Sequence, residues 1–213
     1  MNILAIGAHF DDIELGCGGA LAKHVAEGDR VFAYVATVSG FTSPDNRIVR
    51  ANDTALSEGK KAMEILGVEL ICGNFNTLQI EFTEELNVQI LRIIEGRKIE
   101  KVYTHWIGDI HHDHSAVAKA SLHSCRHVQR MLMYRSNWYH SNVDFRGNFY
   151  VDITNHLGVK MESIRAHASE MERTREKWIE FFQNEAENAG QKIGVKYAEV
   201  FEMVKWLESP RLA

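Results

Sequence analysis

The chain has 213 residues, of which 45% are hydrophobic and only two are proline. This length and composition suffice for a substantial core, so we expect residues 1–213 to form a single domain. The formal charge of −5 and the lack of any Lys/Arg cluster argue against nucleic acids and anionic membranes as partners.

Cysteine usage and hydropathy suggest a compartment. The three cysteines are odd in number and widely spaced, unlike a disulfide framework or a zinc finger. No stretch approaches ~20 consecutive apolar residues and no charged leader precedes the first apolar run, which predicts neither a membrane span nor a signal peptide. These features favour a reducing cytoplasm. They do not determine the oligomeric state and are compatible with a homo-oligomer.

Strands and helices alternate along the first half of the chain. Ile3 to Ile6 form the continuous apolar run of a buried parallel strand. Gly67 is expected to end one helix, and Thr83 to begin the next as its N-cap. The predicted strands cover residues 1–7, 31–38, 70–75 and 101–106; the predicted helices cover residues 20–27, 55–66 and 84–94, and residues 41–46 form a polar loop.

The second half continues the alternation. It contains predicted helices at residues 116–123, 158–172 and 174–187, predicted strands at 128–134 and 148–153, and a last strand or short helix at 197–206. Strands that alternate with helices at this spacing predict an α/β protein. We expect a Rossmann-like three-layer sandwich with a mostly parallel central sheet.

Two polar clusters lie just beyond predicted strands. The first follows the opening strand and contains His9, Asp11 and Asp12; the second, residues 108–115, follows the strand that ends at Trp106. In open α/β sheets, ligands bind at this edge, where the loops that leave the strands form a crevice. We therefore expect the two clusters to face one crevice.

The residue types in the clusters point to metal chemistry. Two His side chains and one carboxylate form the ligand set of a catalytic zinc site, because they leave a coordination position for water. A further carboxylate is then available as a general base, and a further imidazole as an oxyanion stabiliser. The pattern predicts a metal-assisted amide hydrolase. It does not choose between Asp11 and Asp12, or between His111 and His112.

Structural explanations compete with this one. An Asp pair before a helix is often only an N-cap, and an isolated HxDH is often a solvated loop, but their joint position at two strand ends favours a site. Gly16, Gly18 and Gly19 suggest a tight turn before the helix at residue 20; a dinucleotide loop is disfavoured because Leu21 replaces its last glycine. The remaining histidines, including His105, and the four tryptophans, at 106, 138, 178 and 206, are interpreted as surface or packing residues.

The two motifs resemble those of the LmbE/PIG-L family of zinc-dependent N-deacetylases, which act on N-acetylglucosamine-type sugars and related conjugates. Residues 8–14 match AHPDDxE and residues 111–114 match HPDH, with Phe10 and His112 in place of the prolines. Because proline contributes only backbone stiffness there, we expect the chemistry to survive. A later block, residues 160–170, resembles the lysine and H-x-S-Q of the family, with Glu170 in place of Gln.

The resemblance implies a role for each residue of the two motifs. His9, Asp12 and His114 would bind Zn²⁺ or another divalent metal. Asp11 would be the general base and later the proton donor to the departing amine. His111 would stabilise the oxyanion, and Asp113 would orient and charge His111.

The resemblance also suggests substrate contacts. Relatives usually carry Arg where this chain has Ala55, so we expect Arg47 or Arg50 to substitute in contacting the sugar. His167 is expected either to line the pocket or to be a buried residue of its helix. Specificity is expected in the loops at residues 41–53 and 136–147.

The implied function is removal of an N-acetyl group from a small-molecule amino sugar or sugar conjugate. Two alternatives remain: hydrolysis of another small amide on the same scaffold, and a non-catalytic module that binds a metal or a sugar nucleotide. A mere binder has no need of Asp11 and His111, which weighs against the second alternative.

Overall fold

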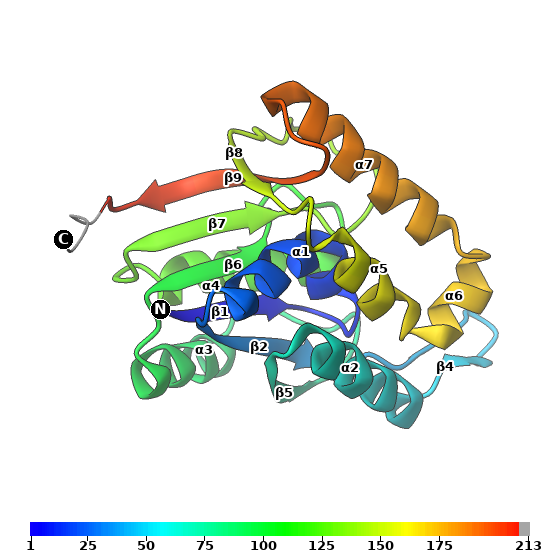
Figure 1. Ribbon diagram of the computed structural model, residues 1–213. Coiled ribbons are helices and arrows are strands. Elements are labelled where there is room, and N and C mark those ends of the chain that lie inside the picture. The colour runs from blue at the N-terminus through cyan, green and yellow to red at the C-terminus, as the bar shows by residue number, and fades with distance from the viewer. Residues whose placement is uncertain (209–213) are drawn as a thin grey trace.

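A seven-stranded sheet in the order β5-β2-β1-β6-β7-β9-β8 runs through the centre of the computed structural model, which describes residues 1–208 (Figure 1). The strands from β5 to β7 in this order are parallel, whereas β9 is antiparallel to both β7 and β8. The predicted mostly parallel sheet is therefore confirmed. The strands are β1 (Asn2–Gly7), β2 (Arg30–Thr37), β5 (Glu69–Phe75), β6 (Lys101–His105), β7 (Arg130–Tyr134), β8 (Phe149–Asp152) and β9 (Ala198–Trp206).

Helices cover both faces of the sheet and complete three layers (Figure 1). Alternate residues of β1 point to opposite faces, so Ile3 packs in one core with α1 and α2, and Leu4 packs in another with α3 and α4. The helices are α1 (Asp12–Ala26), α2 (Asn52–Leu66), α3 (Glu84–Arg97), α4 (His112–Ser124), α5 (Leu157–Arg165), α6 (Ala168–Thr174) and α7 (Lys177–Ile193). Within residues 1–208, none of them is both long and apolar enough to cross a membrane.

Helix α1 begins at Asp12, eight residues before its predicted start at residue 20. The glycines that suggest a turn in the sequence lie inside the helix instead. A Cβ on Gly16 would lie 2.0 Å from Cδ2 of Tyr134, and one on Gly19 would lie 2.8 Å from Cδ1 of Ile153. These glycines are needed because the helix packs closely on its neighbours, and this start places Asp12 in the first turn.

The C-terminal third differs from the prediction in its boundaries. The helix expected over residues 158–172 is broken into α5 and α6, because the backbone of His167 is not helical (φ −81°, ψ 64°). Helix α7 begins at Lys177 and extends to Ile193, and the segment at residues 197–206 forms the strand β9. The predicted ends of the earlier helices at Gly67 and Thr83 are confirmed: Gly67 is left-handed, and Thr83 Oγ1 accepts a hydrogen bond from Leu86 N at 3.3 Å.

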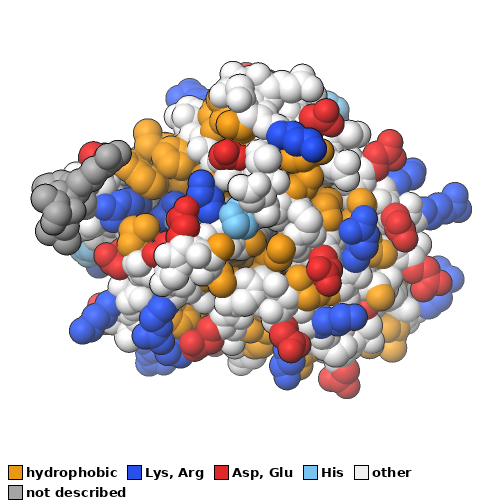
Figure 2. All heavy atoms as spheres, in the orientation of Figure 1, with side chains coloured by type: hydrophobic (Ala, Val, Ile, Leu, Met, Phe, Trp, Pro, Cys, Tyr) orange, Lys and Arg blue, Asp and Glu red, His pale blue; other side chains and the backbone are white. Residues whose placement is uncertain are grey.

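A short antiparallel hairpin occupies the expected polar loop. It consists of β3 (Phe41–Thr42) and β4 (Ile48–Arg50) and lies beside α6 in Figure 1. Its final residue, Arg50, is only 3% exposed, whereas Arg47 near its tip is exposed. The hairpin thus places the guanidinium of Arg50 inside the protein and that of Arg47 in solvent. On the face of the molecule drawn in Figure 2, acidic and basic side chains are interspersed.

Candidate active site

The predicted metal ligands meet at the ends of β1 and β6. His9 follows β1, Asp12 opens α1, and His114 lies in the first turn of α4. His9 Nδ1 is 3.3 Å from an oxygen of Asp12 and 3.2 Å from His114 Nε2, and His114 Nε2 is 3.1 Å from the other Asp12 oxygen. Ligand atoms about 2.0 to 2.1 Å from a tetrahedral metal are about 3.3 Å apart. The spacing therefore fits a metal ion.

A carboxylate stands behind each imidazole. His9 Nε2 lies 2.8 Å from Asp113, and His114 Nδ1 lies 3.0 Å from Asp109. Because an ionised carboxylate only accepts hydrogen bonds, these outer nitrogens carry hydrogens, and once the inner nitrogens lose their protons they offer lone pairs to the same point. Two lone pairs that converge in this way suit a cation bound between them. Carboxylates behind ligating histidines are the usual support of such a metal site.

The electrostatics of the three residues also suit a cation. Burial alone would lower the pKa of His9 and of His114, but the surrounding carboxylates outweigh it and raise these pKa values to about 9 and about 10. Burial alone would raise the pKa of Asp12, but His114 and His105 hold it well below its usual value. A metal that binds here displaces the imidazole protons, since only neutral imidazole is a ligand.

Asp11 lies beside this donor set in a strained backbone conformation, with φ 138° and ψ −30°. It is the N-cap of α1, but its side chain makes no capping hydrogen bond. The carboxylate lines a cavity instead, where Arg50 Nη1 donates to it at 3.2 Å. Burial, reinforced by the Asp12 charge, raises the pKa of Asp11 to about 7, which suits a group that exchanges protons near neutral pH.

Arg50 connects Asp11 to a buried charged network. Its guanidinium donates to the carbonyl of Phe10 at 2.9 Å, to Glu58 at 2.8 Å and to His167 Nδ1 at 3.0 Å. His167 Nε2 in turn contacts Glu14 at 2.7 Å. Arg50 therefore faces the site as one of the two expected arginines.

The other two predicted substrate contacts lie elsewhere. Arg47 is exposed near the hairpin tip and is not among the cavity-lining residues. His167 is fully buried, and of its two expected positions it occupies the buried one. It lies at the break between α5 and α6 rather than within a helix.

His111 lines the same cavity, but its partners differ from the expectation. Asp113 contacts His9, and it also accepts hydrogen bonds from the backbone N–H groups of Leu78 and Ile80 at 2.7 and 3.1 Å. It makes no hydrogen bond to His111, whose Nδ1 has no hydrogen-bond partner within residues 1–208. Burial and the neighbouring imidazoles lower the pKa of His111 to about 4, so its ring is neutral at pH 7.

Several site residues were missed in the sequence. His105 stacks on His114, with ring centroids 4.0 Å apart, and its Nε2 lies 3.2 Å from Asp12. Ser136 Oγ donates to Asp12 at 2.9 Å, and Asn137 Nδ2 donates to both oxygens of Asp109 at 3.0 and 2.8 Å. The signal for His105 was its position at the C-terminal end of a predicted strand; Ser136 and Asn137 likewise follow a predicted strand and open the loop in which specificity was expected.

The cavity has a volume of about 350 Å³ and is lined by His9, Asp11, Asp12, His111 and His114 together with aromatic side chains. Trp138 and Trp178 are among these aromatic residues, which corrects their interpretation as packing residues alone. An α/β sheet that presents two His, one ligating carboxylate and one further carboxylate to a cavity is typical of metal-dependent hydrolases.

The comparison of the chain with known families agrees with this class. Residues 4–125 match the model of the PIG-L family, described as GlcNAc-PI de-N-acetylase. The Escherichia coli K12 protein named uncharacterized deacetylase YaiS is 33% identical over 184 residues, which cover 79% of this chain and 91% of that protein. The chain therefore belongs to the PIG-L family of deacetylases.

Solved structures share the fold. The N,N'-diacetylchitobiose deacetylase of Pyrococcus horikoshii is similar with a TM-score of 0.81 and 22% identity, over 99% of this chain and 87% of that one. The 4-carboxy-2-hydroxymuconate hydratase of Pseudomonas putida KT2440 also has a TM-score of 0.81, with 17% identity over 100% of this chain and 99% of that one. Because one fold hosts both activities, the function of this chain has to be argued from its site.

Proposed function

We propose that this protein is a divalent-metal-dependent N-deacetylase that releases acetate from an N-acetylglucosamine-type sugar or sugar conjugate. The observation that carries the proposal is that His9 Nδ1 and His114 Nε2 lie 3.2 Å apart and each lies 3.1 to 3.3 Å from one of the two Asp12 oxygens, with carboxylates behind both imidazoles. Zinc is the metal that these nitrogen and oxygen donors suit best. When bound, it lowers the pKa of a water molecule and polarises the amide carbonyl.

Asp11 supplies the proton transfers. Its carboxylate faces the cavity beside the donor set, so it takes a proton from the attacking water and delivers it to the amine as the C–N bond breaks. Arg50 fixes the direction of the carboxylate through its contact at 3.2 Å. The products are acetate and the free amino sugar.

His111 stabilises the negative charge that develops on the amide oxygen. Its pKa of about 4 means that the ring approaches the substrate as neutral imidazole, which donates through one N–H. Its orientation comes from stacking on His114, with centroids 4.3 Å apart, and from the His111 backbone N–H, which donates to Asp109 at 2.8 Å.

Metal analysis combined with acetate release tests the proposal. We expect about one divalent metal per chain, loss of acetate release from N-acetylated amino sugars after chelation, and recovery with zinc. The exposed His112 provides a matched control for His111, because the two residues are adjacent. His111→Ala should lower turnover by roughly 10²- to 10³-fold with the metal retained, whereas His112→Ala should have a mild effect. Protein that binds no metal at His9, Asp12 and His114 in the presence of saturating zinc would overturn the proposal.

A further inference from the structure

The cavity has two chemically different sides. The metal-ligand candidates form a buried part, in which Asp12 is 3% and His114 is 4% exposed. Outside this part, the lining combines polar residues with apolar and aromatic ones, which include Phe41, Leu78, Trp138, Tyr139 and Trp178. Leu78 is 59% and Tyr139 is 51% exposed, so this apolar lining extends from the site to the protein surface.

Trp138 has a fixed position relative to the reaction centre. The two residues before it, Ser136 and Asn137, are hydrogen-bonded to Asp12 and Asp109, the groups that form and support the metal site. Consecutive Cα atoms are about 3.8 Å apart. Trp138 is therefore the residue next to this anchor, and its side chain lines the same cavity as the metal-ligand candidates.

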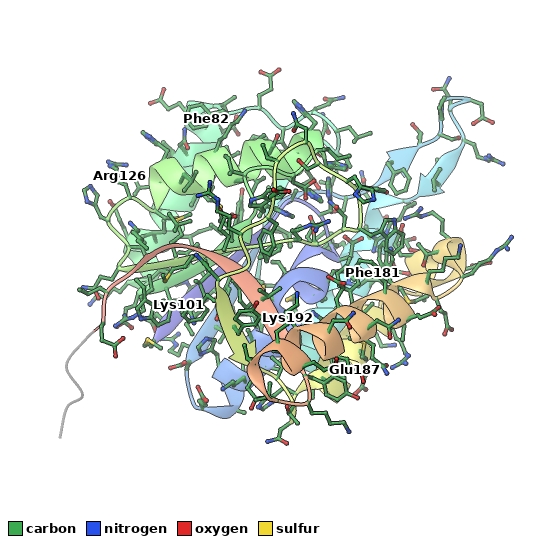
Figure 3. The ribbon with its side chains drawn as sticks, turned by 90° about the horizontal axis from the view of Figure 1, so that it is seen from above. Phe82, Lys101, Arg126, Phe181, Glu187 and Lys192 are labelled. Atoms are coloured by element: carbon green, nitrogen blue, oxygen red, sulfur yellow. The ribbon has the colours of Figure 1, made fainter. Side chains whose placement is uncertain are left out.

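Helix α7 supports Trp138 and supplies the second tryptophan. Trp138 meets Phe181 of α7 edge to face, with centroids 5.4 Å apart and an interplanar angle of 69°; Phe181 is labelled in Figure 3. Trp178 lies three residues before Phe181, on the same side of the helix. Both helix residues pack against the core around Phe182, so the aromatic wall is held in place before any ligand binds.

Charges on the cavity lining are already compensated. Arg50 is paired with Asp11 and Glu58, and Arg173 is paired with Glu170. Among the lining residues, all within the described part of the chain, neither arginine is left without a carboxylate. This arrangement disfavours a phosphate or carboxylate next to the sugar and favours an uncharged group.

We infer that Trp138 and Trp178 form a subsite for a second, uncharged ring with an apolar face, bonded to the acetamido sugar. The inference rests on the proposed function, because it identifies the group that the sugar carries. The ring is a second sugar or an aryl group, since both present an apolar face to an aromatic side chain. Binding energy from this remote ring positions the amide for attack and raises kcat/KM.

Three substrates with one acetamido group each test the inference. They are N-acetyl-β-glucosamine linked to a methyl group, the same sugar linked β-1,4 to glucose, and the same sugar linked to a 4-nitrophenyl group. We expect the zinc-loaded enzyme to prefer at least one ring-bearing substrate over the methyl glycoside by about tenfold in kcat/KM. In Trp138→Ala and in Trp178→Ala this ratio should fall to about 1. Trp138→Phe, which keeps an aromatic ring, should retain most of it.

Using a ratio separates recognition from damage to the fold, because a misfolded variant loses activity on all three substrates alike. Trp206→Phe, on β9 and outside the cavity lining, should keep the parental ratio. Preference for the disaccharide alone or for the aryl glycoside alone supports the inference and identifies the ring. A parental ratio near 1, or an unchanged ratio in both alanine variants, overturns the inference and leaves the deacetylase in place. No acetate from any substrate overturns both.

Discussion

Asp11 combines a left-handed backbone with a carboxylate that points into the cavity. A non-glycine residue in such a conformation costs about 1 to 3 kcal/mol. The surroundings hold it there: its carbonyl accepts a hydrogen bond from Leu15 N at 3.0 Å, and Arg50 binds both its carboxylate and the carbonyl of Phe10. The strain directs Asp11 away from its capping role and toward the site.

Changing each of the two adjacent aspartates to asparagine should produce a different kind of defect. Asp11→Asn should keep the metal and lower turnover by about 10²- to 10⁴-fold, because the proton transfers are lost. Asp12→Asn should weaken metal binding together with activity. Bound zinc and acetate release measure the two defects. An Asp11→Asn protein that contains no metal, or whose turnover is within about tenfold of the parent, would contradict the assignment of Asp11 as the base.

The pH profile gives a second measurement of Asp11. The base form is the carboxylate, so the rate should fall as the pH falls through the pKa of Asp11, which burial and the charge of Asp12 raise to about 7. A bound dication neutralises Asp12 and moves this acidic limb below pH 7. Asp11→Asn should lack the limb.

Arg50 should act as a positioning residue. Arg50→Lys keeps the positive charge, but a single ammonium cannot reach Phe10, Asp11, Glu58 and His167 as the planar guanidinium does. We expect kcat to fall by about 10- to 10²-fold, with metal content and KM little changed. Arg47→Ala, at the exposed end of the same hairpin, is the matched control and should behave as the parent. Equal effects of the two substitutions would exclude this role.

At the scale of the element, the glycines of α1 allow this helix to pack closely against neighbouring side chains. Its first turn holds Asp12, and its close approach to β7 and to Ile153 fixes where that turn lies. Tyr134, which covers Gly16, also donates from its hydroxyl to the carbonyl of Ile6 at 2.8 Å. The ring therefore cannot move away without losing a buried hydrogen bond.

Two glycine-to-alanine substitutions in helices should have opposite signs. Gly16→Ala places a Cβ 2.0 Å from the Tyr134 ring and should lower the free energy of unfolding by about 1 to 3 kcal/mol, despite the better helix propensity of alanine. Gly96 lies in α3 with nothing within 4 Å of the added Cβ, so Gly96→Ala should raise it by about 0.5 to 1 kcal/mol. Denaturant unfolding of both variants decides; stabilisation by Gly16→Ala would refute the packing argument.

At the scale of the whole molecule, the two ends of the parallel strands bury different charged groups. The carboxyl ends of the parallel strands carry the candidate site. The opposite end buries Lys101, labelled in Figure 3, which is 3% exposed and lies over the rings of Tyr103 and Trp206 at 4.6 and 5.0 Å. Its ammonium lies 3.1 Å from His24 Nε2. Burial lowers the pKa of Lys101 to about 8.

This buried lysine predicts a pH-dependent stability. Between pH 8 and about 10.4, the unfolded chain holds a proton that the folded chain has released, so the free energy of unfolding contributed by Lys101 rises with pH across this window. Lys101→Met should remove that rise and stabilise the protein at pH 7 by on the order of 1 to 3 kcal/mol. His24 Nε2 then still has the Tyr103 hydroxyl at 3.1 Å.

Urea unfolding at pH 7 and at pH 9.5 provides the measurement for Lys101→Met. Lys60→Met, at an exposed position of α2, is the control for the loss of one surface charge. If Lys101→Met proves less stable than the parent at pH 7, the cation contributes more through its ring contacts than its burial costs.

Much of the fold and of the site could be predicted because the signals are local. A continuous apolar run such as residues 3–6 suits only a strand that is buried on both faces, and alternation with helices then favours parallel pairing. In a parallel sheet, residues that follow strands share one edge, so His9 and His114 could be placed together from sequence. The motif registers, through the family resemblance, then separated Asp11 from Asp12.

The tertiary structure alone decided which atoms face each other. Asp113 supports His9 rather than His111, Arg50 rather than Arg47 reaches Asp11, and two tryptophans that looked scattered line one cavity. The glycines of α1 likewise look like a turn until Tyr134 is seen against Gly16. Each of these facts depends on side chains brought together by chain reversals over tens of residues. A sequence pattern records the spacing of residues along the chain, whereas close packing in three dimensions sets the direction of each side chain.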